Sequence, residues 1–188
     1  RARLTEAIDF ARGQADWLAR TLAAMPAPDR PTFGATIPFE GTPLTLTPGP
    51  VRSPRRDGDR LILPADPERL GLRLETWLKH CARLRLQSAT EHYAAALGRP
   101  FRRITLRDTR SRWGSCAADG SLSYNWRLIM APAGVLDYVA AHEVAHLAEM
   151  NHSPAFWAVV ARLRPGYAPE RAWLKRHGGA LHAIRFRD

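Results

Sequence analysis

The chain of 188 residues is long enough to form one domain with its own hydrophobic core, and 45% of its residues are hydrophobic. Charged residues or prolines interrupt every hydrophobic run well before the roughly 18 residues that a membrane helix needs, which excludes a membrane-spanning protein. The formal net charge of +10 at pH 7 leaves two interpretations open: an acidic partner such as nucleic acid, or an arginine-rich surface that reflects GC-rich codon usage.

Cysteine usage favours a reducing compartment. Cys81 and Cys116 are too few for a disulfide framework and show no metal-binding spacing, so we expect free thiols. We therefore expect a soluble, cytoplasmic protein. Because the sequence begins at Arg1 and not at methionine, we also expect a trimmed amino end, with a removed signal peptide as an open alternative.

Residues 1–63 predict a helix followed by a hairpin region. Hydrophobic residues recur at three- and four-residue intervals from Leu4 to Met25, which is typical of an amphipathic helix. Glycine-containing turns at residues 40–41 and 57–58 then separate short strand-like segments. The predicted hairpin strands are residues 36–39, 44–46 and 60–63.

Residues 64–188 predict the portion that carries the chemistry. A long helix is expected over residues 66–98, followed by three strands at residues 104–106, 112–116 and 122–126 that we expect to form an antiparallel sheet. A second main helix is expected over residues 132–150, and shorter helices start at residues 153 and 170. We expect both portions to form a single domain over residues 1–188.

The segment from His142 to His146 places two histidines four residues apart within the second main helix. Their imidazoles therefore project from the same helix face and can reach one ion, and Glu143 lies beside them. Histidines that merely populate an amphipathic helix are the alternative explanation. Because a catalytic zinc ion usually has three protein ligands and one open position, the motif predicts a further ligand elsewhere in the chain.

His152 is the candidate for this third ligand. It follows His146 by six residues, too far along a straight helix to reach the same ion. We therefore expect the helix to end near Met150 and the chain to turn back. Asn151 suits that turn because asparagine tolerates the left-handed backbone conformation, and a new helix can begin directly afterwards.

Three neutral nitrogen ligands favour Zn²⁺ over Mg²⁺ or Ca²⁺, which prefer oxygen ligands. We expect a zinc-bound water to attack a peptide bond, with Glu143 taking its proton and passing it to the leaving amine. A structural zinc site would close its fourth position with another Cys or His and would not need a glutamate. A zinc-stabilised binding module without catalysis stays open as an alternative.

These motifs resemble the YgjP-like zinc metallopeptidases, relatives of the SprT-like and WLM proteins within the zincin group. The matching segments are SRWGSC (111–116), YNWRL (124–128), DYV (137–139), HEVAH (142–146), NHS (151–153) and FW (156–157). The resemblance is close over residues 104–174 and weaker over residues 33–97. It implies an α+β, zincin-like fold in which a small antiparallel sheet packs on the active-site helix and its edge strand borders the substrate cleft.

The same resemblance implies that His142, His146 and His152 are zinc ligands and that Glu143 is the catalytic base. Members usually carry strands before the first helix, which implies truncation at the amino end of this chain. Some members have also been labelled UTP pyrophosphohydrolases, so a metal-dependent nucleotide pyrophosphohydrolase is the alternative function. That chemistry usually relies on Mg²⁺ held by carboxylates, whereas this motif offers imidazoles. Glu149 replaces the turn glycine of metzincins, which excludes that group.

Substrate contacts are predicted on the expected edge strand. Trp113, Gly114 and Ser115 are candidates to align a peptide by strand addition, although a purely structural strand explains them equally well. Arg112 and Tyr167 are candidate stabilisers of the oxyanion. Arginine-rich flanks at residues 99–112 and 162–188 keep a nucleic-acid partner possible. The sequence does not indicate the oligomeric state or the cleavage preference.

Overall fold

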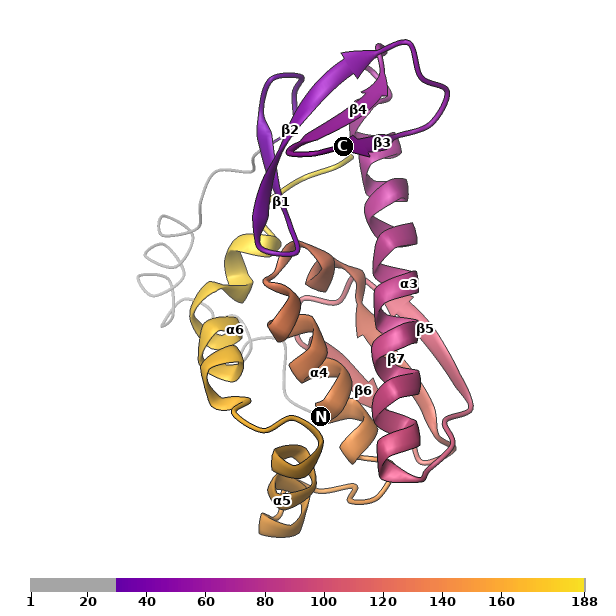
Figure 1. Cartoon of the computed structure of the whole chain (residues 1–188), viewed down its shortest axis with the longest axis vertical. Helices are drawn as coiled ribbons and strands as arrows, with labels where there is room; N and C mark the ends of the chain where they lie inside the picture. Colours follow the sequence, from indigo (N-terminus) through magenta and orange to yellow (C-terminus); the bar gives the residue numbers. More distant parts are fainter. Residues whose placement is uncertain (1–29, 188) are drawn as a thin grey trace, which may run out of the picture.

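The computed structural model describes residues 30–187, so the helix predicted from Leu4 to Met25 lies outside the described residues. The described part of the chain combines two small sheets with helices (Figure 1), which confirms the predicted α+β class. Its elements are β1 (Thr36–Phe39), β2 (Thr42–Gly49), β3 (Arg55–Asp57), β4 (Arg60–Pro64), α3 (Leu70–Leu97), β5 (Arg103–Arg107), β6 (Gly114–Cys116), β7 (Ser121–Asn125), the 3-10 helix η1 (Trp126–Met130), α4 (Ala133–Ala145), α5 (Pro154–Leu163) and α6 (Ala168–Leu181).

The first sheet has four strands in the order β1-β2-β4-β3. The pairs β1-β2 and β3-β4 are antiparallel, and their turns lie at the predicted glycines, whereas β2 and β4 pair in parallel. The strand β3 was not predicted, because Arg-Arg-Asp is exposed throughout and lacks alternating hydrophobic residues. Four fully buried leucines form the inner face of the central strands: Leu44, Leu46, Leu61 and Leu63.

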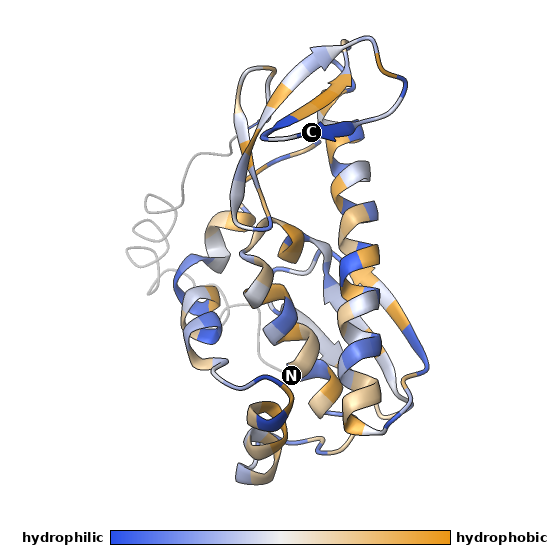
Figure 2. Ribbon diagram, viewed as in Figure 1, coloured by the Kyte–Doolittle hydropathy of each residue, from blue (hydrophilic) through white to orange (hydrophobic). Residues whose placement is uncertain are grey.

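Helix α3 runs along the molecule, with the four-stranded sheet at its first turns and α4 beside its second half (Figure 1). Buried residues recur at every fourth position of this helix: Leu70, Leu74, Leu78, Ala82 and Leu86. They give the helix one continuous hydrophobic face, and Figure 2 shows hydrophobic positions in orange between hydrophilic ones in blue along α3. The helix stops at Gly98, which has φ 70° and donates its N–H to Ala95, while Arg99 donates to Ala94. The predicted end of this helix is therefore confirmed, whereas the helix begins at Leu70, four residues after the predicted start at Asp66.

The second sheet has three strands in the order β5-β7-β6. β6 and β7 are antiparallel, but β5 and β7 are parallel, so the prediction of an entirely antiparallel sheet is wrong. The segment between β5 and β6 is long enough to leave space for one strand between them. After the turn at Gly120, β7 occupies that central position. Hydrophobic alternation predicts strands but does not fix their partners. β6 lies at the sheet edge, as predicted.

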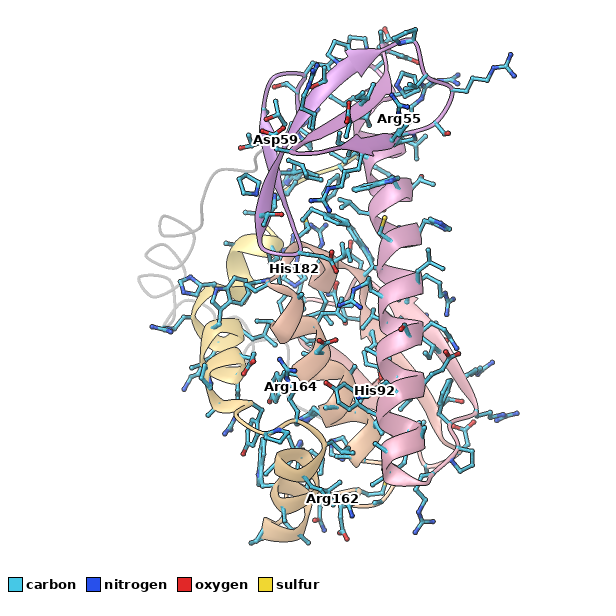
Figure 3. The ribbon with its side chains drawn as sticks, in the orientation of Figure 1. Arg55, Asp59, His92, Arg162, Arg164 and His182 are labelled. Atoms are coloured by element: carbon cyan, nitrogen blue, oxygen red, sulfur yellow. The ribbon has the colours of Figure 1, made fainter. Side chains whose placement is uncertain are left out.

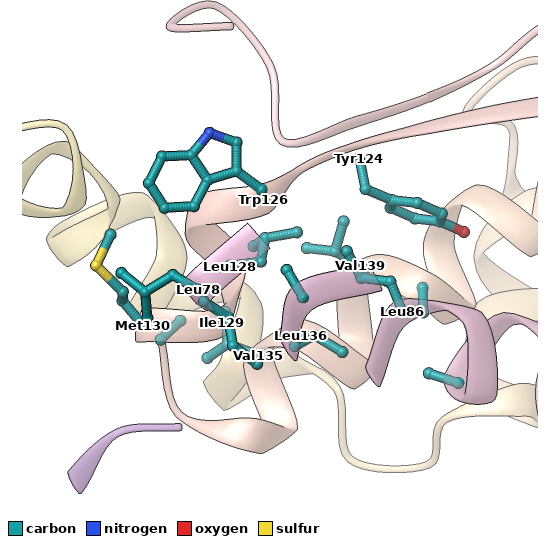
Figure 4. Close-up of a cluster of buried hydrophobic side chains, with 14 of the residues drawn as sticks. Leu78, Leu86, Tyr124, Trp126, Leu128, Ile129, Met130, Val135, Leu136 and Val139 are labelled. Carbon is teal, nitrogen blue, oxygen red and sulfur yellow. The ribbon is translucent and has the colours of Figure 1, made fainter. Parts of the chain in front are cut away.

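Helix α4 is buried between α3, β6, α5 and α6. Hydrophobic side chains from α3, β7, η1 and α4 meet around its first turns (Figure 4), among them Leu78, Tyr124, Trp126, Leu128 and Leu136. This core fixes the helix that carries the HEVAH segment. None of the helices within residues 30–187 is long and apolar enough to cross a membrane.

The residues that follow α6 connect η1 to the first turns of α3. Arg127, which is 9% exposed, donates to Asp108 at 2.7 Å and to the carbonyl oxygens of Leu181 and Ile184 at 2.8 and 2.9 Å. Beyond them the backbone of Phe186 crosses α3 directly at Gly71, where a Cβ atom would collide with the Phe186 carbonyl group. Helix α6 is longer than the predicted segment 170–176, and its end positions this crossing.

Candidate active site

Helix α4 ends earlier than predicted. It stops at Ala145, and His146 is its C-cap, so the prediction that it continues to about Met150 is wrong. The N–H groups of Leu147 and Ala148 donate to carbonyl groups only three residues back, at 2.9 and 3.0 Å, which tightens the last turn. The early end leaves the chain from residue 147 onward free to turn back towards the helix face.

The turn that returns the chain does not use a left-handed Asn151, contrary to the prediction. Among the residues from 30 to 187, Glu40 is the one non-glycine residue with a positive φ. Instead, the side-chain oxygen of Asn151 accepts a hydrogen bond from the N–H of Ser153 at 3.3 Å. Ser153 then caps α5 by accepting from Phe156 at 3.3 Å, with Pro154 in the first turn. His152 is held between these two local bonds.

The structure brings the three predicted histidines together. One side-chain nitrogen from each of His142, His146 and His152 lies within 4.8 Å of the others. The Nε2 atoms of His142 and His152 are 3.1 Å apart. Two nitrogens bound at about 2.1 Å to one tetrahedral zinc lie about 3.4 Å apart, so this spacing fits a shared ion.

The protonation states of these histidines also fit metal binding. Nδ1 of His146 lies 2.9 Å from the carbonyl oxygen of Glu149, to which it donates, so Nε2 keeps its lone pair. Burial, with smaller contributions from the two other histidines, lowers the pKa of His142 to about 3, and burial lowers the pKa of His146 as well. Both imidazoles are therefore neutral at pH 7, as a ligand requires.

Glu143 points at the edge strand β6. Its side chain is 5% exposed, and a Cβ atom placed on Gly114 would lie 2.6 Å from both Cγ and Cδ of this glutamate. Only glycine therefore leaves room for the carboxylate. Burial raises the pKa of Glu143 to about 8, against the opposing influence of Arg112. A carboxylate whose pKa is near the working pH can both accept and return a proton.

One cleft contains the histidines, Glu143 and part of the edge strand. It is lined by Ser111, Arg112, Gly114, Ser115, Cys116, His142, Glu143, His146, Met150 and His152. Of the predicted substrate contacts, Gly114 and Ser115 line this cleft and Trp113 does not. The Trp113 ring packs on α6 instead, 4.9 Å from the His182 ring, whose position Figure 3 shows, and against Gly178.

Aromatic rings form a wall behind the histidines, which sequence reasoning had not identified. Tyr138 lies one turn before His142 on α4 and stacks on Tyr167 at 5.8 Å, and Tyr167 stacks on Trp157 at 5.6 Å. Trp157 in turn stacks on His152 at 5.9 Å. The one available signal was the four-residue spacing from Tyr138 to His142, which places both on one helix face.

The positions of four residues near this wall restrict the roles that each can have. Phe156 is fully buried and stacks on the His146 ring at 4.4 Å, so it is a core residue. Of the two candidate oxyanion stabilisers, Arg112 lines the cleft, whereas Tyr167 is engaged in the stack. Burial, followed by the charges of Glu143 and Asp119, raises the pKa of Cys116 to about 11, which disfavours a thiolate nucleophile.

A partly buried ion pair supports the wall from the side of α6. Arg164, which is labelled in Figure 3, follows α5 and donates to Glu170 at 3.1 Å. A Cβ atom on Gly134 of α4 would lie 3.1 Å from atoms of both side chains, so this pair packs directly on the backbone of the active-site helix. The three helices α4, α5 and α6 are thus fixed to one another next to the histidines.

Residues 1–177 match the YgjP-like family, described as a metallopeptidase domain. No curated protein matches the chain. Among solved structures, the crystal structure of the metallopeptidase zymogen of Pyrococcus abyssi abylysin is similar with a TM-score of 0.45 and 20% identity, covering 53% of this chain and 97% of that chain. Since the family match spans nearly the whole sequence, this chain belongs to the YgjP-like metallopeptidase domain family and is a metal-dependent peptidase.

Proposed function

We propose that this protein is a zinc-dependent peptidase in which His142, His146 and His152 hold the zinc and Glu143 is the general base. The observation that carries the proposal is the convergence of three imidazole nitrogens beside one buried carboxylate in a single cleft. Glu143 is the one carboxylate among the residues that line this cleft, which disfavours a Mg²⁺-dependent nucleotide pyrophosphohydrolase. We further propose that residues 1–188 act as a single catalytic domain.

The residues of the cleft divide the reaction between them. A bound zinc ion supplies a Lewis acid that polarises the scissile carbonyl group and acidifies water. Glu143 accepts the proton of the attacking water and returns it to the leaving amine. Arg112 lines the same cleft and offers guanidinium donors to the oxygen atom that becomes negative.

The edge strand supports binding of an extended peptide. Trp113 accepts from the N–H of Asn125 at 2.8 Å, and Ala117 donates to Ser121 at 2.9 Å, so these backbone groups face β7. Backbone groups alternate along an antiparallel pair, which leaves the N–H and C=O groups of Gly114 and Cys116 directed away from β7. A substrate strand can pair with them and carry its peptide bond past Glu143.

The test compares the zinc content and peptide hydrolysis of the wild-type protein with those of Glu143→Gln. We expect about one zinc per chain in both proteins, because the amide keeps the shape and Glu143 is not a ligand. Peptide hydrolysis should fall by a factor on the order of 10² to 10⁴ in the variant, the usual contribution of a general base.

Three outcomes would contradict the proposal. Zinc-free protein that takes up no zinc would remove the metal site. Wild-type rates in Glu143→Gln would remove the assigned base. Hydrolysis of UTP without hydrolysis of any peptide in a library would identify the nucleotide pyrophosphohydrolase instead.

A further inference from the structure

A second cavity lies directly beside the cleft that contains the histidines. It has a volume of about 290 Å³ and shares Ser111, Arg112, Gly114 and Ser115 with that cleft, so the two meet at the edge strand β6. We name it the outer cavity. Its lining residues are Arg107, Thr109, Ser111, Arg112, Trp113, Gly114, Ser115, Ser123, Tyr124 and Asn125.

The outer cavity is chemically suited to an anion. Its lining residues include two arginines, Arg107 and Arg112, and no Asp or Glu. Within residues 30–187 neither guanidinium forms an ion pair, and the carboxylate of Asp108, next to Arg107 in the chain, is bound to Arg127 at 2.7 Å. The hydroxyl group of Ser115 donates to that of Ser123 at 3.4 Å across β6 and β7, so the Ser123 hydroxyl keeps its own hydrogen to donate to a bound anion.

The strand register decides which side chains of a bound peptide reach this cavity. Gly114 faces Glu143 and α4, so its neighbour Ser115 faces the opposite side of the sheet. A peptide paired with the free edge of β6 follows the same alternation. A substrate residue opposite Gly114 or Cys116 therefore directs its side chain towards α4, and the residue opposite Ser115 directs its side chain towards the outer cavity.

We propose that the outer cavity is a specificity subsite that binds the carboxylate side chain of an Asp or Glu in the substrate. This acidic residue is the one opposite Ser115, and its two neighbours in the substrate direct their side chains towards α4. This inference rests on the proposed peptidase function and names its substrate class. Arg107 is the distinguishing residue, because it lines the outer cavity alone, whereas Arg112 lines both cavities. A guanidinium matches a carboxylate in shape and can donate two parallel hydrogen bonds to it.

The test uses peptides that differ at a single position, scanned across the residues around the cleaved bond, with Glu, Gln or Lys at that position. For the wild-type protein we expect one position at which kcat/KM is about 5- to 20-fold higher for Glu than for Gln and lowest for Lys. The size is modest because both arginines are exposed and salt screens the attraction. Raising the salt concentration should reduce the Glu to Gln ratio.

Two variants assign the effect to the cavity. Arg107→Gln should bring the Glu to Gln ratio close to one, and Arg107→Glu should reverse the preference towards Lys. Arg103→Gln is the matched control, because Arg103 is an exposed arginine of the same strand that does not line the cavity. The ratio in this control should equal that of the wild type.

The failures of the two proposals are distinguishable. Equal cleavage of Glu and Gln peptides at every position would overturn the subsite and leave the peptidase intact. An equal loss on both peptides in Arg107→Gln would also overturn it, because such a loss reflects a structural effect. A phosphoserine peptide strongly preferred over Glu would replace the carboxylate by a phosphate as the ligand. Cleavage of none of the peptides would instead count against the peptidase function.

Discussion

The two sheets differ in the side chains that they present to the helices packed on them. The four-stranded sheet packs four leucines with no exposed surface towards α3, and the charged residue that its register places on the same face, Arg56, lies on the edge strand β3 with its guanidinium 5.4 Å from the Phe39 ring. The three-stranded sheet packs Leu122 and Tyr124 in the same way from its central strand, but its edge strand presents Gly114 to the carboxylate of Glu143. The first sheet therefore serves packing. The second sheet has a glycine on its edge strand, and the absence of a side chain at Gly114 leaves space for the carboxylate of Glu143.

One arginine connects the two regions. Arg85 of α3 binds Glu40, in the turn between β1 and β2, at 2.7 Å, and it lies 3.9 Å from Asp137 of α4. Glu40 also donates its backbone N–H to Ile129 of η1 at 2.7 Å. The four-stranded sheet thus holds the start of the active-site helix, although it contributes no residue to the cleft. Mutations in the two regions should accordingly separate stability from activity.

The largest effect is expected for His152→Ala. Removing one of three ligands should lower zinc affinity, and peptide hydrolysis should fall by a factor on the order of 10³ or more as zinc is lost. The melting temperature of the zinc-loaded protein should also fall, since metal binding stabilises the folded state. Titration with a chelator and a thermal melt measure both effects.

His80→Ala is the control, because His80 is exposed on α3, outside the cleft. The control should retain zinc and activity. Zinc content in His152→Ala equal to that of the control would show that His152 is not a ligand.

A smaller loss of activity is expected for Gly114→Ala. The new methyl group would overlap the side chain of Glu143, so either β6 or the carboxylate must move. We expect hydrolysis to fall by a factor on the order of 10², the effect of a misplacement of about 1 Å in a catalytic group. The zinc content should stay unchanged, because the ligands are on α4 and near the start of α5.

Gly179→Ala is the matched control for the added methyl group. Gly179 lies on α6, and a Cβ atom there would meet no atom within 4 Å. Alanine is also the better helix former, so this variant should be at least as stable as the wild type. Full activity in Gly114→Ala would contradict the close approach of β6 to Glu143.

Leu63→Ala should affect stability and leave the chemistry nearly unaltered. Leu63 is fully buried in the four-stranded sheet, and replacing a buried leucine by alanine costs about 2–5 kcal/mol of unfolding free energy. The kcat/KM of the folded protein, measured well below the melting transition, should stay within about twofold of wild type. Leu72→Ala, at a position that is 45% exposed, should lose much less stability. A large fall in kcat/KM for Leu63→Ala would show that the two regions are coupled.

The local features of the site could be predicted from the sequence because they depend on nearby residues. The four-residue spacing of His142 and His146 determines a shared helix face, and the signals at Ser153 and Pro154 determine where α5 begins. Gly98 likewise ends α3 as its backbone freedom predicts.

The features that the sequence did not predict depend on distant contacts. The parallel pairing of β5 with β7 follows from the path of the chain between them, not from their residues. Arg127 is buried by carbonyl groups more than 50 residues away, and a surface position would have been expected for an arginine. The reason for Gly114 emerged only once Glu143 was placed against it.

The smallest expected effect uses the cysteines, one in each region, as probes of charge. Burial raises the pKa of both Cys81 and Cys116 to about 11, so alkylation by iodoacetamide at pH 8 should be slower than for a free thiol by a factor on the order of 10². The rate should rise with pH up to about 11 as the thiolate forms.

After burial, the next largest cause of the raised pKa is the charge of a nearby carboxylate, which is Glu40 for Cys81 and Glu143 for Cys116. At pH 10 the carboxyl group of Glu143, with a pKa of about 8, is negatively charged. Glu143→Gln removes that charge, which should lower the pKa of Cys116 and speed its alkylation a few-fold, while Cys81 should react as before. Mass spectrometry of both cysteine peptides over a pH series measures the two rates in one sample, so that Cys81 serves as the internal control. Equal acceleration of both thiols would indicate general loosening of the fold, and an unchanged rate at Cys116 would contradict the position of Glu143 beside β6.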